Sequence, residues 1–232
     1  MITFIVPTYA NPNGLHDTLL SIRGNLSYSE GHKESIECIV LFDCKDPSLR
    51  LGIDVCELAE LNPMPIRYFI YETPSLTARV NHAAMYVATP FMCVINDDII
   101  LGKSNSPLLD RVTTPLEAYK DKIVALYFCS KDENDYDYRF PIISKRVVEL
   151  IGYLYHPICA VPVICERWVN SIFDSLDRMS FLKGAELSIN VDCPTNMYFD
   201  EAVKQEAESI YKHTASVRKG TVELLKQFLV KE

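Results

Sequence analysis

In the first half of the chain, short and mainly apolar runs alternate with helix-like patterns. The runs cover residues 3–6, 38–42, 66–71 and 91–95, and proline or polar residues follow each of them. Between the runs, apolar residues recur every three or four positions over 15–26 and 76–87, which is the spacing of one helix face. Strands separated by helices predict a mostly parallel sheet with helices on both faces, and such sheets bind ligands beyond the carboxyl ends of their strands. The residues after each strand are therefore the first place to look for a site.

The second half of the chain is less regular. We predict a fifth strand over 123–129, a helix over 144–154 capped by Ser144, an amphipathic helix over 163–176 and a last strand over 187–191. From residue 200 the pattern predicts one or two helices, with an apolar face of Val222, Leu225, Phe228 and Leu229. Together these elements predict one α/β domain over 1–232 with a C-terminal helical appendage.

Composition narrows the class of protein. The chain has 232 residues, 48% of them hydrophobic and 23% charged, which fits a folded domain with a core large enough to surround a cleft. No uncharged run approaches the roughly 18 apolar residues of a membrane-spanning helix, and the first residues lack a secretory-signal pattern. The eight cysteines are scattered without a C-x-x-C pair, so we expect reduced core cysteines and a cytoplasmic protein. A net charge of −8 disfavours broad nucleic-acid binding.

The sequence Asn96-Asp97-Asp98 directly follows the predicted strand over 91–95. Two carboxylates carried by a buried strand should be exposed at its end, because burying them unpaired is costly. Oxygen ligands of this kind suit Mg²⁺ or Mn²⁺, which proteins often hold through one or two carboxylates and the phosphates of a substrate. A simple turn is the alternative, since Asn and Asp side chains readily bond their own backbone.

Other strand ends also carry side chains suited to a site. The first strand ends in Pro7-Thr8-Tyr9 and the second in Asp43, and Arg79 stands in the helix before the fourth strand. We expect these residues to converge with the Asn-Asp-Asp sequence on one edge of the sheet. The structural alternatives are a helix cap for Asp43, a surface ion pair for Arg79 and a core position for Tyr9.

Four motifs in this order resemble those of inverting glycosyltransferases of family two, which have a nucleotide-binding GT-A fold. The motifs are Ile5-Val6-Pro7-Thr8-Tyr9, Ile39-Val40-Leu41-Phe42-Asp43, Thr77-Ala78-Arg79-Val80-Asn81-His82-Ala83 and Ile95-Asn96-Asp97-Asp98. The resemblance covers residues 1–101 and implies that they form the nucleotide-binding half. It leaves 102–199 as the acceptor-side half and 200–232 as the helical tail.

The resemblance implies a role for each matched residue. Residues 7–9 would pack against the nucleotide, Asp43 would hydrogen-bond its base, and Arg79 would lie near the base or the diphosphate. The donor implied is a nucleoside diphosphate sugar, with a UDP-sugar favoured.

The Asn-Asp-Asp sequence stands where the family has its D-x-D motif. Because Asn96 replaces the first acid, the resemblance assigns the metal ligand to Asp98 and places Asn96 and Asp97 beside the ribose or the phosphates. Many relatives add a histidine from a late strand, but residues 187–194 contain none. The candidates to replace it are, in order, Asp192, Cys193, His156 and His213. The missing histidine leaves the dependence on Mn²⁺ or Mg²⁺ open.

Sugar transfer also requires a base that takes the proton of the acceptor hydroxyl as it attacks the anomeric carbon. In this family the acid commonly stands near the start of a helix beyond the fifth strand, and Cys165-Glu166-Arg167-Trp168 resembles that arrangement. It follows residues 140–146, which resemble the segment lining the acceptor side. The resemblance therefore names Glu166 as the catalytic residue. The alternative is a first-turn glutamate that only complements the helix dipole.

The leading hypothesis is metal-assisted transfer of a hexose or similar sugar, with inversion, to a hydroxyl of a glycan, a small molecule, a protein or a modified nucleobase. DNA is the less favoured acceptor and would need Lys145, Arg146 and Arg167 to form a basic rim beside the cleft. A nucleotide-sugar-binding module with weakened catalysis is the alternative, because of Asn96 and the absent histidine. A nucleotidyltransferase is disfavoured because residues 9–14 lack its glycine-rich basic opening, and a dehydrogenase because no G-x-G-x-x-G follows a strand.

Overall fold

The computed structural model describes residues 2–25, 36–73, 75–102, 108–129, 136–159, 162–190 and 201–230. Its strands are β1 (Ile2–Pro7), β2 (Ile36–Asp43), β3 (Ile66–Tyr71), β4 (Phe91–Val94), β5 (Ile99–Leu101), β6 (Ala125–Cys129), β7 (Tyr136–Ser144) and β8 (Met179–Ile189). Its helices are α1 (Pro12–Arg23), α2 (Leu49–Cys56), α3 (Leu76–Met85), α4 (Leu108–Ala118), α5 (Lys145–Ile151), α6 (Pro162–Ser175), α7 (Glu201–His213) and α8 (Ala215–Lys226), with a short 3₁₀ helix, η1, at Ala59–Leu61.

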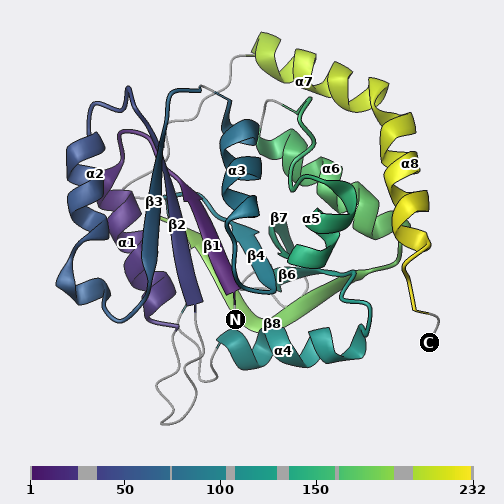
Figure 1. Cartoon of the computed structure of the whole chain (residues 1–232), viewed down its shortest axis with the longest axis horizontal. Helices are drawn as coiled ribbons and strands as arrows, with labels where there is room; N and C mark the ends of the chain where they lie inside the picture. Colours follow the sequence, from purple (N-terminus) through teal and green to yellow (C-terminus); the bar gives the residue numbers. More distant parts are fainter. Residues whose placement is uncertain are drawn as a thin grey trace.

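The strands form one sheet in the order β3-β2-β1-β4-β7-β6-β8-β5. The first four strands of this order are parallel to one another, and β8 is parallel to β6. Only β7 and β5 run against their described neighbours. The predicted mostly parallel sheet is confirmed, and the carboxyl ends of β1, β2, β3 and β4 lie together on its upper edge in Figure 1.

Helices cover both faces of the sheet, and alternate residues of each strand supply the two cores. Phe4 packs in one cluster with Leu15 of α1, whereas the next residue, Ile5, packs in the other with Val80 of α3 and Trp168 of α6. All five side chains are fully buried. Figure 1 shows α1 and α2 on one side of the first strands and α3, α5, α6 and α8 on the other. This two-residue alternation is what a strand buried on both faces requires.

The helix starts follow the capping signals of the sequence. The side chain of Asn11 accepts a hydrogen bond from the Gly14 N–H at the start of α1. Ser75 caps α3 and Ser144 caps α5, each through a side-chain oxygen that accepts a backbone N–H, so both predicted caps are confirmed. Gly152, in the left-handed region at φ 85°, ends α5 earlier than predicted.

Five elements were not predicted from the sequence, namely α2, η1, α4, β5 and β7, and β8 begins at Met179 instead of residue 187. The C-terminal prediction of one or two helices is confirmed, since α7 and α8 are both present. Val222 and Leu225 are buried in the same cluster as Trp168, whereas Phe228 is exposed. Cys44 is also exposed, so the expectation of core cysteines is wrong there. In the described ranges, no helix is both long and apolar enough to cross a membrane.

Candidate functional site

An ion pair between a buried arginine and a half-buried aspartate stands at the carboxyl end of β2. Arg79 of α3 is only 7% exposed, and its Nη2 donates a hydrogen bond to Oδ2 of Asp43. The Arg79 Nε donates to the carbonyl of Thr73 at 2.6 Å, and Oδ1 of Asp43 accepts the backbone N–H of Lys45 at 2.8 Å. Burial raises the pKa of Asp43, but the Lys45 N–H and the Arg79 guanidinium outweigh it and hold this pKa below its usual value. Asp43 is therefore a fixed carboxylate acceptor at the edge of the sheet.

The structural alternatives for these residues are wrong. Ser48, not Asp43, stands at the N-cap position of α2. Arg79 is buried within its ion pair instead of lying on the surface. Tyr9 is 57% exposed and is not a core residue, so its ring is available to a ligand at the end of β1. Pro7 and Thr8, which precede it, are buried.

The end of β1 is joined to the loop after β4. The Thr8 hydroxyl donates to Oδ2 of Asp97 at 2.6 Å, and the Asp97 residue is only 1% exposed. The backbone of Gly14 lies against the same loop, because a Cβ added there would be 2.5 Å from the Asp97 carbonyl oxygen. Asn96, half-buried, accepts the N–H of Ile99 through its carbonyl. The Asn-Asp-Asp sequence thus makes a turn that also carries two carboxylates.

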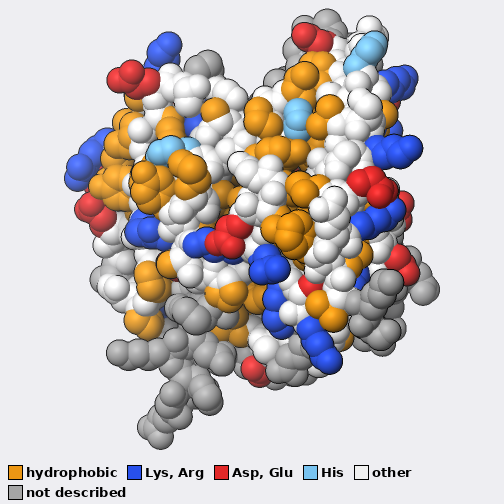
Figure 2. Space-filling view, turned by 45° about the vertical axis from the view of Figure 1, so that its right-hand side comes forward, with side chains coloured by type: hydrophobic (Ala, Val, Ile, Leu, Met, Phe, Trp, Pro, Cys, Tyr) orange, Lys and Arg blue, Asp and Glu red, His pale blue; other side chains and the backbone are white. Residues whose placement is uncertain are grey.

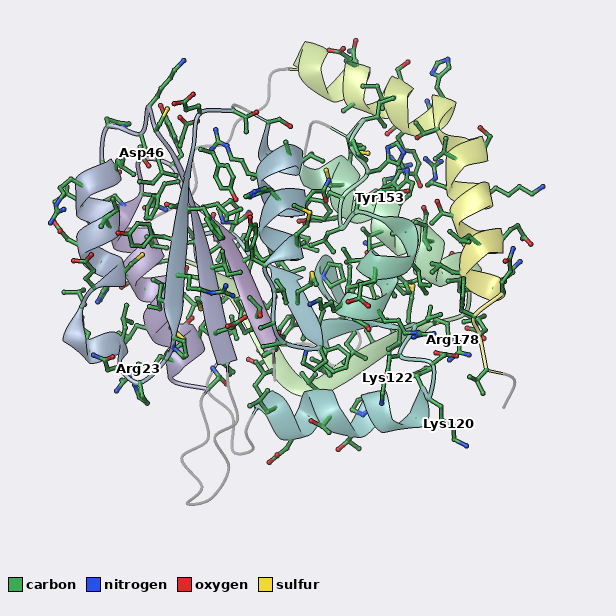
Figure 3. All side chains as sticks on the ribbon, viewed as in Figure 1. Arg23, Asp46, Lys120, Lys122, Tyr153 and Arg178 are labelled. Carbon is green, nitrogen blue, oxygen red and sulfur yellow. The ribbon has the colours of Figure 1, made fainter. Side chains whose placement is uncertain are left out.

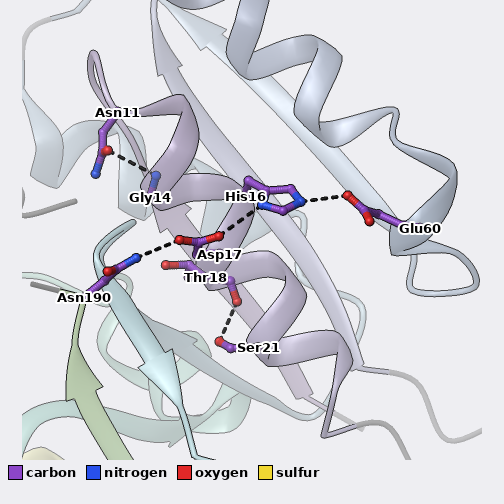
Figure 4. A network of polar contacts seen from close by, with 8 residues as sticks. All are labelled: Asn11, Gly14, His16, Asp17, Thr18, Ser21, Glu60 and Asn190. Atoms are coloured by element: carbon purple, nitrogen blue, oxygen red, sulfur yellow. Dashed lines mark hydrogen bonds and ion pairs between the residues drawn. The ribbon is translucent and has the colours of Figure 1, made fainter. Parts of the chain in front are cut away.

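The backbone of Asp98 is held from the end of β8. Its carbonyl accepts the N–H of Asn190 at 2.6 Å, directly beyond the Ile99 and Ile189 pair of the β5–β8 ladder. The Asn190 side chain donates to Oδ2 of Asp17 in α1 at 2.9 Å, as Figure 4 shows. Asp97 and Asp98 are both buried, so the expectation that these carboxylates are exposed at the end of the strand is wrong.

The donor set at this edge fits a hard cation. Within the described ranges, no three His, Cys, Asp or Glu side chains gather as a metal-binding group. Asp97 and Asp98 nevertheless place two carboxylates next to each other in this loop, and one or two carboxylates together with substrate phosphates are the usual ligands of Mg²⁺ or Mn²⁺ in proteins. Asp192 and Cys193, the predicted replacements for a histidine, lie outside the described residues.

The two candidate histidines have other surroundings. The ring of His156 stacks on Trp168 with centroids 4.9 Å apart, and burial lowers the pKa of this histidine. His213 is exposed at the end of α7 and contacts Ser209. Neither belongs to a metal-binding group in the part of the chain that the structure describes.

Glu166 is the fifth residue of α6 and is only 9% exposed. The first turn of α6 contains no acidic residue, so the reading of Glu166 as a first-turn glutamate is wrong. Burial and, to a lesser extent, the charge of Glu166 raise the pKa of Cys93 in β4. The neighbouring Cys165 lies 3.6 Å from the hydroxyl of Thr77, two residues before Arg79 in α3. The start of α6 therefore meets the start of α3, which brings Glu166 toward the edge that holds the Asp43 ion pair.

Lys145, Arg146 and Arg167 do not form the basic rim beside this edge that DNA binding would need. Lys145 and Arg146 line a cavity of about 400 Å³ together with Lys122 and Phe91, the first residue of β4, and therefore lie at the amino ends of the strands. In Figure 3, Lys122 is at the lower end of the molecule and Asp46, which accepts the backbone N–H of Ala10 after β1, is near the upper end.

Arg167 is also occupied elsewhere. Its guanidinium lies 4.1 Å from the Tyr211 ring centroid and pairs with Glu208 of α7. Figure 2 shows one face of the molecule, which is notched at its upper rim. The charged side chains of the face it shows are of both signs and mixed with apolar ones, without a broad basic surface.

Solved structures of glycosyltransferases resemble this chain over nearly its whole length. Staphylococcus aureus TarS gives a TM-score of 0.62 at 15% identity, and the match covers 98% of this chain and 42% of TarS. TarS 1–349 in complex with UDP-GlcNAc gives 0.63 at 13% identity, covering 98% of this chain and 71% of that one. The mannosyltransferase PcManGT from Pyrobaculum calidifontis, in complex with GDP-Man and Mn²⁺, gives 0.59 at 10% identity, covering 98% and 73%.

The chain has a GT-A-type fold. This confirms the fold class expected from the strand-end motifs. The sequence matches no family model and no curated protein. The chain spans less than half of the full TarS chain, so the GT-A-type likeness carries the architecture and not the activity of the larger protein.

Sequence reasoning missed three residues at this edge of the sheet, namely Gly14, Asp17 and Asn190. Asn190 lies within the segment that was searched for a metal-binding histidine, but an amide was not considered there. Asp17 lies 173 positions away from Asn190 in sequence, and no local pattern could have linked them.

Proposed function

We propose that this chain is an inverting glycosyltransferase that moves a sugar from a nucleoside diphosphate donor to an acceptor hydroxyl. The observation that carries the proposal is the shared edge of a GT-A-type sheet. The Asp43–Arg79 pair stands there at the end of β2, and Thr8 joins Asp97, the residue next to Asp98, to the end of β1. The donor is assigned to residues 1–101 and the acceptor to 102–199.

The chemistry of Asp43 suits a nucleobase. Because the pKa of Asp43 is lowered, the side chain is a carboxylate at neutral pH and accepts N–H groups. The exposed Tyr9 ring offers a flat surface at the same edge. A UDP-sugar is the favoured donor, and the solved relatives support this class: TarS is known with UDP and UDP-GlcNAc, and PcManGT with GDP-Man.

The leaving group of such a reaction is a diphosphate. Asp98, with Asp97 beside it, would hold Mn²⁺ or Mg²⁺ at this edge, and the bound cation would stabilise the negative charge that develops on the diphosphate. PcManGT is known with Mn²⁺, and the glucosyl-3-phosphoglycerate synthase of Mycobacterium tuberculosis with Mg²⁺ and UDP.

Glu166 is assigned as the base. Inversion requires the hydroxyl to attack from the side of the sugar opposite the diphosphate, so the base has to come from the acceptor half. Glu166 on α6 meets this requirement, and its carboxylate takes the proton of the attacking hydroxyl. Its buried position keeps bulk water away from the carboxylate.

The proposal is tested with isotope-labelled UDP- and GDP-sugars, using hydrolysis to free sugar where no acceptor is known. We expect turnover that Asp98→Ala abolishes and that Glu166→Gln slows by at least about 100-fold without weakening nucleotide binding. Glu223→Gln, the same change at an exposed ion pair on α8, is the control and should keep the full rate.

Two results would change the assignment. If Asp98→Ala and Glu166→Gln both keep full activity, the roles given to these residues are wrong. If calorimetry shows nucleotide binding but no donor gives product, the chain is a nucleotide-sugar-binding module, the alternative that Asn96 in place of the first acid of the motif favours.

A further inference from the structure

We infer that Asn190 positions Asp98, the carboxylate residue proposed to hold the cation, and that Asp17 of α1 holds Asn190 in place for this purpose. The inference rests on the proposed function of the sheet edge. It assigns a positioning role to two residues that do not belong to any of the motifs described above.

The backbone of Asn190 sets the position of Asp98. β5 and β8 pair antiparallel from Leu101 and Leu187 to Ile99 and Ile189. The Asn190 N–H continues this ladder by one residue, because it donates to the Asp98 carbonyl at 2.6 Å. Any displacement of Asn190 is therefore passed directly to the residue proposed to hold the cation.

One face of α1 supports both carboxylate residues. Gly14 and Asp17 are three positions apart, so they lie on the same face of the helix. Gly14 touches the Asp97 carbonyl oxygen closely enough to leave no room for a Cβ, and Asp17 binds the Asn190 side chain at 2.9 Å. The first two turns of α1 thus set the positions of Asp97 directly and of Asp98 through Asn190.

The second oxygen of Asp17 is also engaged. Its Oδ1 lies 3.1 Å from Nδ1 of His16, and Nε2 of His16 lies 2.7 Å from Oε1 of Glu60 (Figure 4). The carboxylate is thereby oriented toward Asn190. The Asp17 side chain is nevertheless 45% exposed, so the loss of its hydrogen bond leaves no fully buried polar group without a partner. The effect should appear in the geometry of the donor site more than in the stability of the fold.

The test measures the affinity for UDP by calorimetry with and without Mn²⁺, for the full chain. In Asn190→Ala and in Asp17→Ala we expect the gain in affinity due to Mn²⁺ to fall about fivefold to tenfold, the loss expected for one hydrogen bond. The affinity without Mn²⁺ should stay unchanged, and Tm should fall by no more than about 3 °C. Asn190→Asp places two carboxylates next to each other and should lose the largest part of the Mn²⁺-linked gain in UDP affinity.

The exchange of the two groups gives the sharpest readout. The double variant Asp17→Asn with Asn190→Asp keeps one amide and one carboxylate in contact, so the Mn²⁺-linked affinity should return toward the wild-type value. Lys226→Ala removes a hydrogen bond of the same length, 2.9 Å, on α8 and should change nothing.

The outcomes separate this inference from the proposed function. If the wild type binds UDP more tightly with Mn²⁺ and the single variants do the same to an equal extent, Asn190 has no positioning role and the proposed function stands. The inference is also overturned if the Mn²⁺-linked gain in UDP affinity of the double variant is no larger than that of Asn190→Asp. If the wild type binds neither UDP nor GDP, both fail. If Asn190→Ala does not fold, Asp17→Ala gives the same readout with the Asn190 backbone untouched.

Discussion

Two glycines in helices allow the same substitution to be made with opposite expected effects. Gly14 is the third residue of α1, and a Cβ there would lie 2.3 Å from the Asn11 Nδ2 and 2.5 Å from the Asp97 carbonyl oxygen. Gly220 lies inside α8, and a Cβ there would have nothing within 4 Å. We expect Gly14→Ala to destabilise the protein and Gly220→Ala to stabilise it.

The magnitudes follow from packing and helix propensity. At Gly14 the backbone of the loop or of the helix has to move by about 1 Å, and overpacking of this kind costs about 1–3 kcal/mol. Moving Asn11 aside would also break its 3.2 Å cap to the Gly14 N–H, worth about 1 kcal/mol. The gain in helix propensity recovers up to about 1 kcal/mol, which leaves a net loss of about 2 kcal/mol. At Gly220 only the gain of about 0.5–1 kcal/mol remains.

Thermal unfolding with UDP titration measures both effects. For a chain of this size, we expect Tm to fall by about 4–8 °C in Gly14→Ala and to rise by about 1–4 °C in Gly220→Ala. UDP affinity should drop only in Gly14→Ala, because only that change displaces Asp97. If the two variants raise Tm equally, the contact between α1 and the Asp97 loop is not as close as described, and its role in placing the carboxylates is refuted.

Three further predictions concern ionised groups. Asp43→Asn leaves the buried Arg79 without its counter-charge and should lower the free energy of unfolding by about 3 kcal/mol, measured by chemical denaturation. Because the pKa of Asp43 is lowered in the folded state, the stability that Asp43 contributes is present above pH 3.8 and lost as the pH falls through the folded pKa. The stability of the variant should therefore fall less steeply with acid than that of the wild type. The pKa of His16 is raised mainly by its hydrogen bond to Glu60, so the stability that His16 contributes is present below pH 6.5 and lost as the pH rises through the folded pKa. His16→Gln should remove this dependence of stability on pH, and a variant that keeps it would contradict the role given to His16. Asp121 is buried, pairs with Arg178 at 3.3 Å and accepts the Val230 N–H at 2.9 Å. Asp121→Asn should lower the free energy of unfolding by about 3 kcal/mol and leave the affinity for UDP unchanged. A loss of UDP affinity alongside the loss of stability would argue against a purely structural role.

The fold could be predicted where strands are strongly buried and where elements close in the sequence also pack together. β1 and β4 are buried on both faces, and the apolar runs that form them are ended by a proline or by polar residues, so their limits were visible in the sequence. β7 contains Pro141, and its pairing with β4 and β6 is a tertiary contact that no local pattern gives. α4 has Pro115 inside it, which argues against a helix by propensity alone. These elements depend on tertiary neighbours.

The candidate site divides in the same way. Asp43 and Asp98 could be placed on one edge because the ends of parallel strands must meet there. The contact between Arg79 and Asp43 was expected only as convergence, and its burial became clear from the structure. The support of Asp98 by Asn190 depends on the late return of β8 to β5, which the sequence pattern does not specify.

The path of β8 limits how the two halves of the molecule can move. Its first residues pair with β6, from Met179 to Leu182, and its last residues pair with β5, from Leu187 to Ile189. A hinge motion that separated the halves would have to break one of these ladders or bend the strand itself. Admission of a bulky substrate should therefore come from rearrangement of side chains and connecting segments, while the framework stays closed.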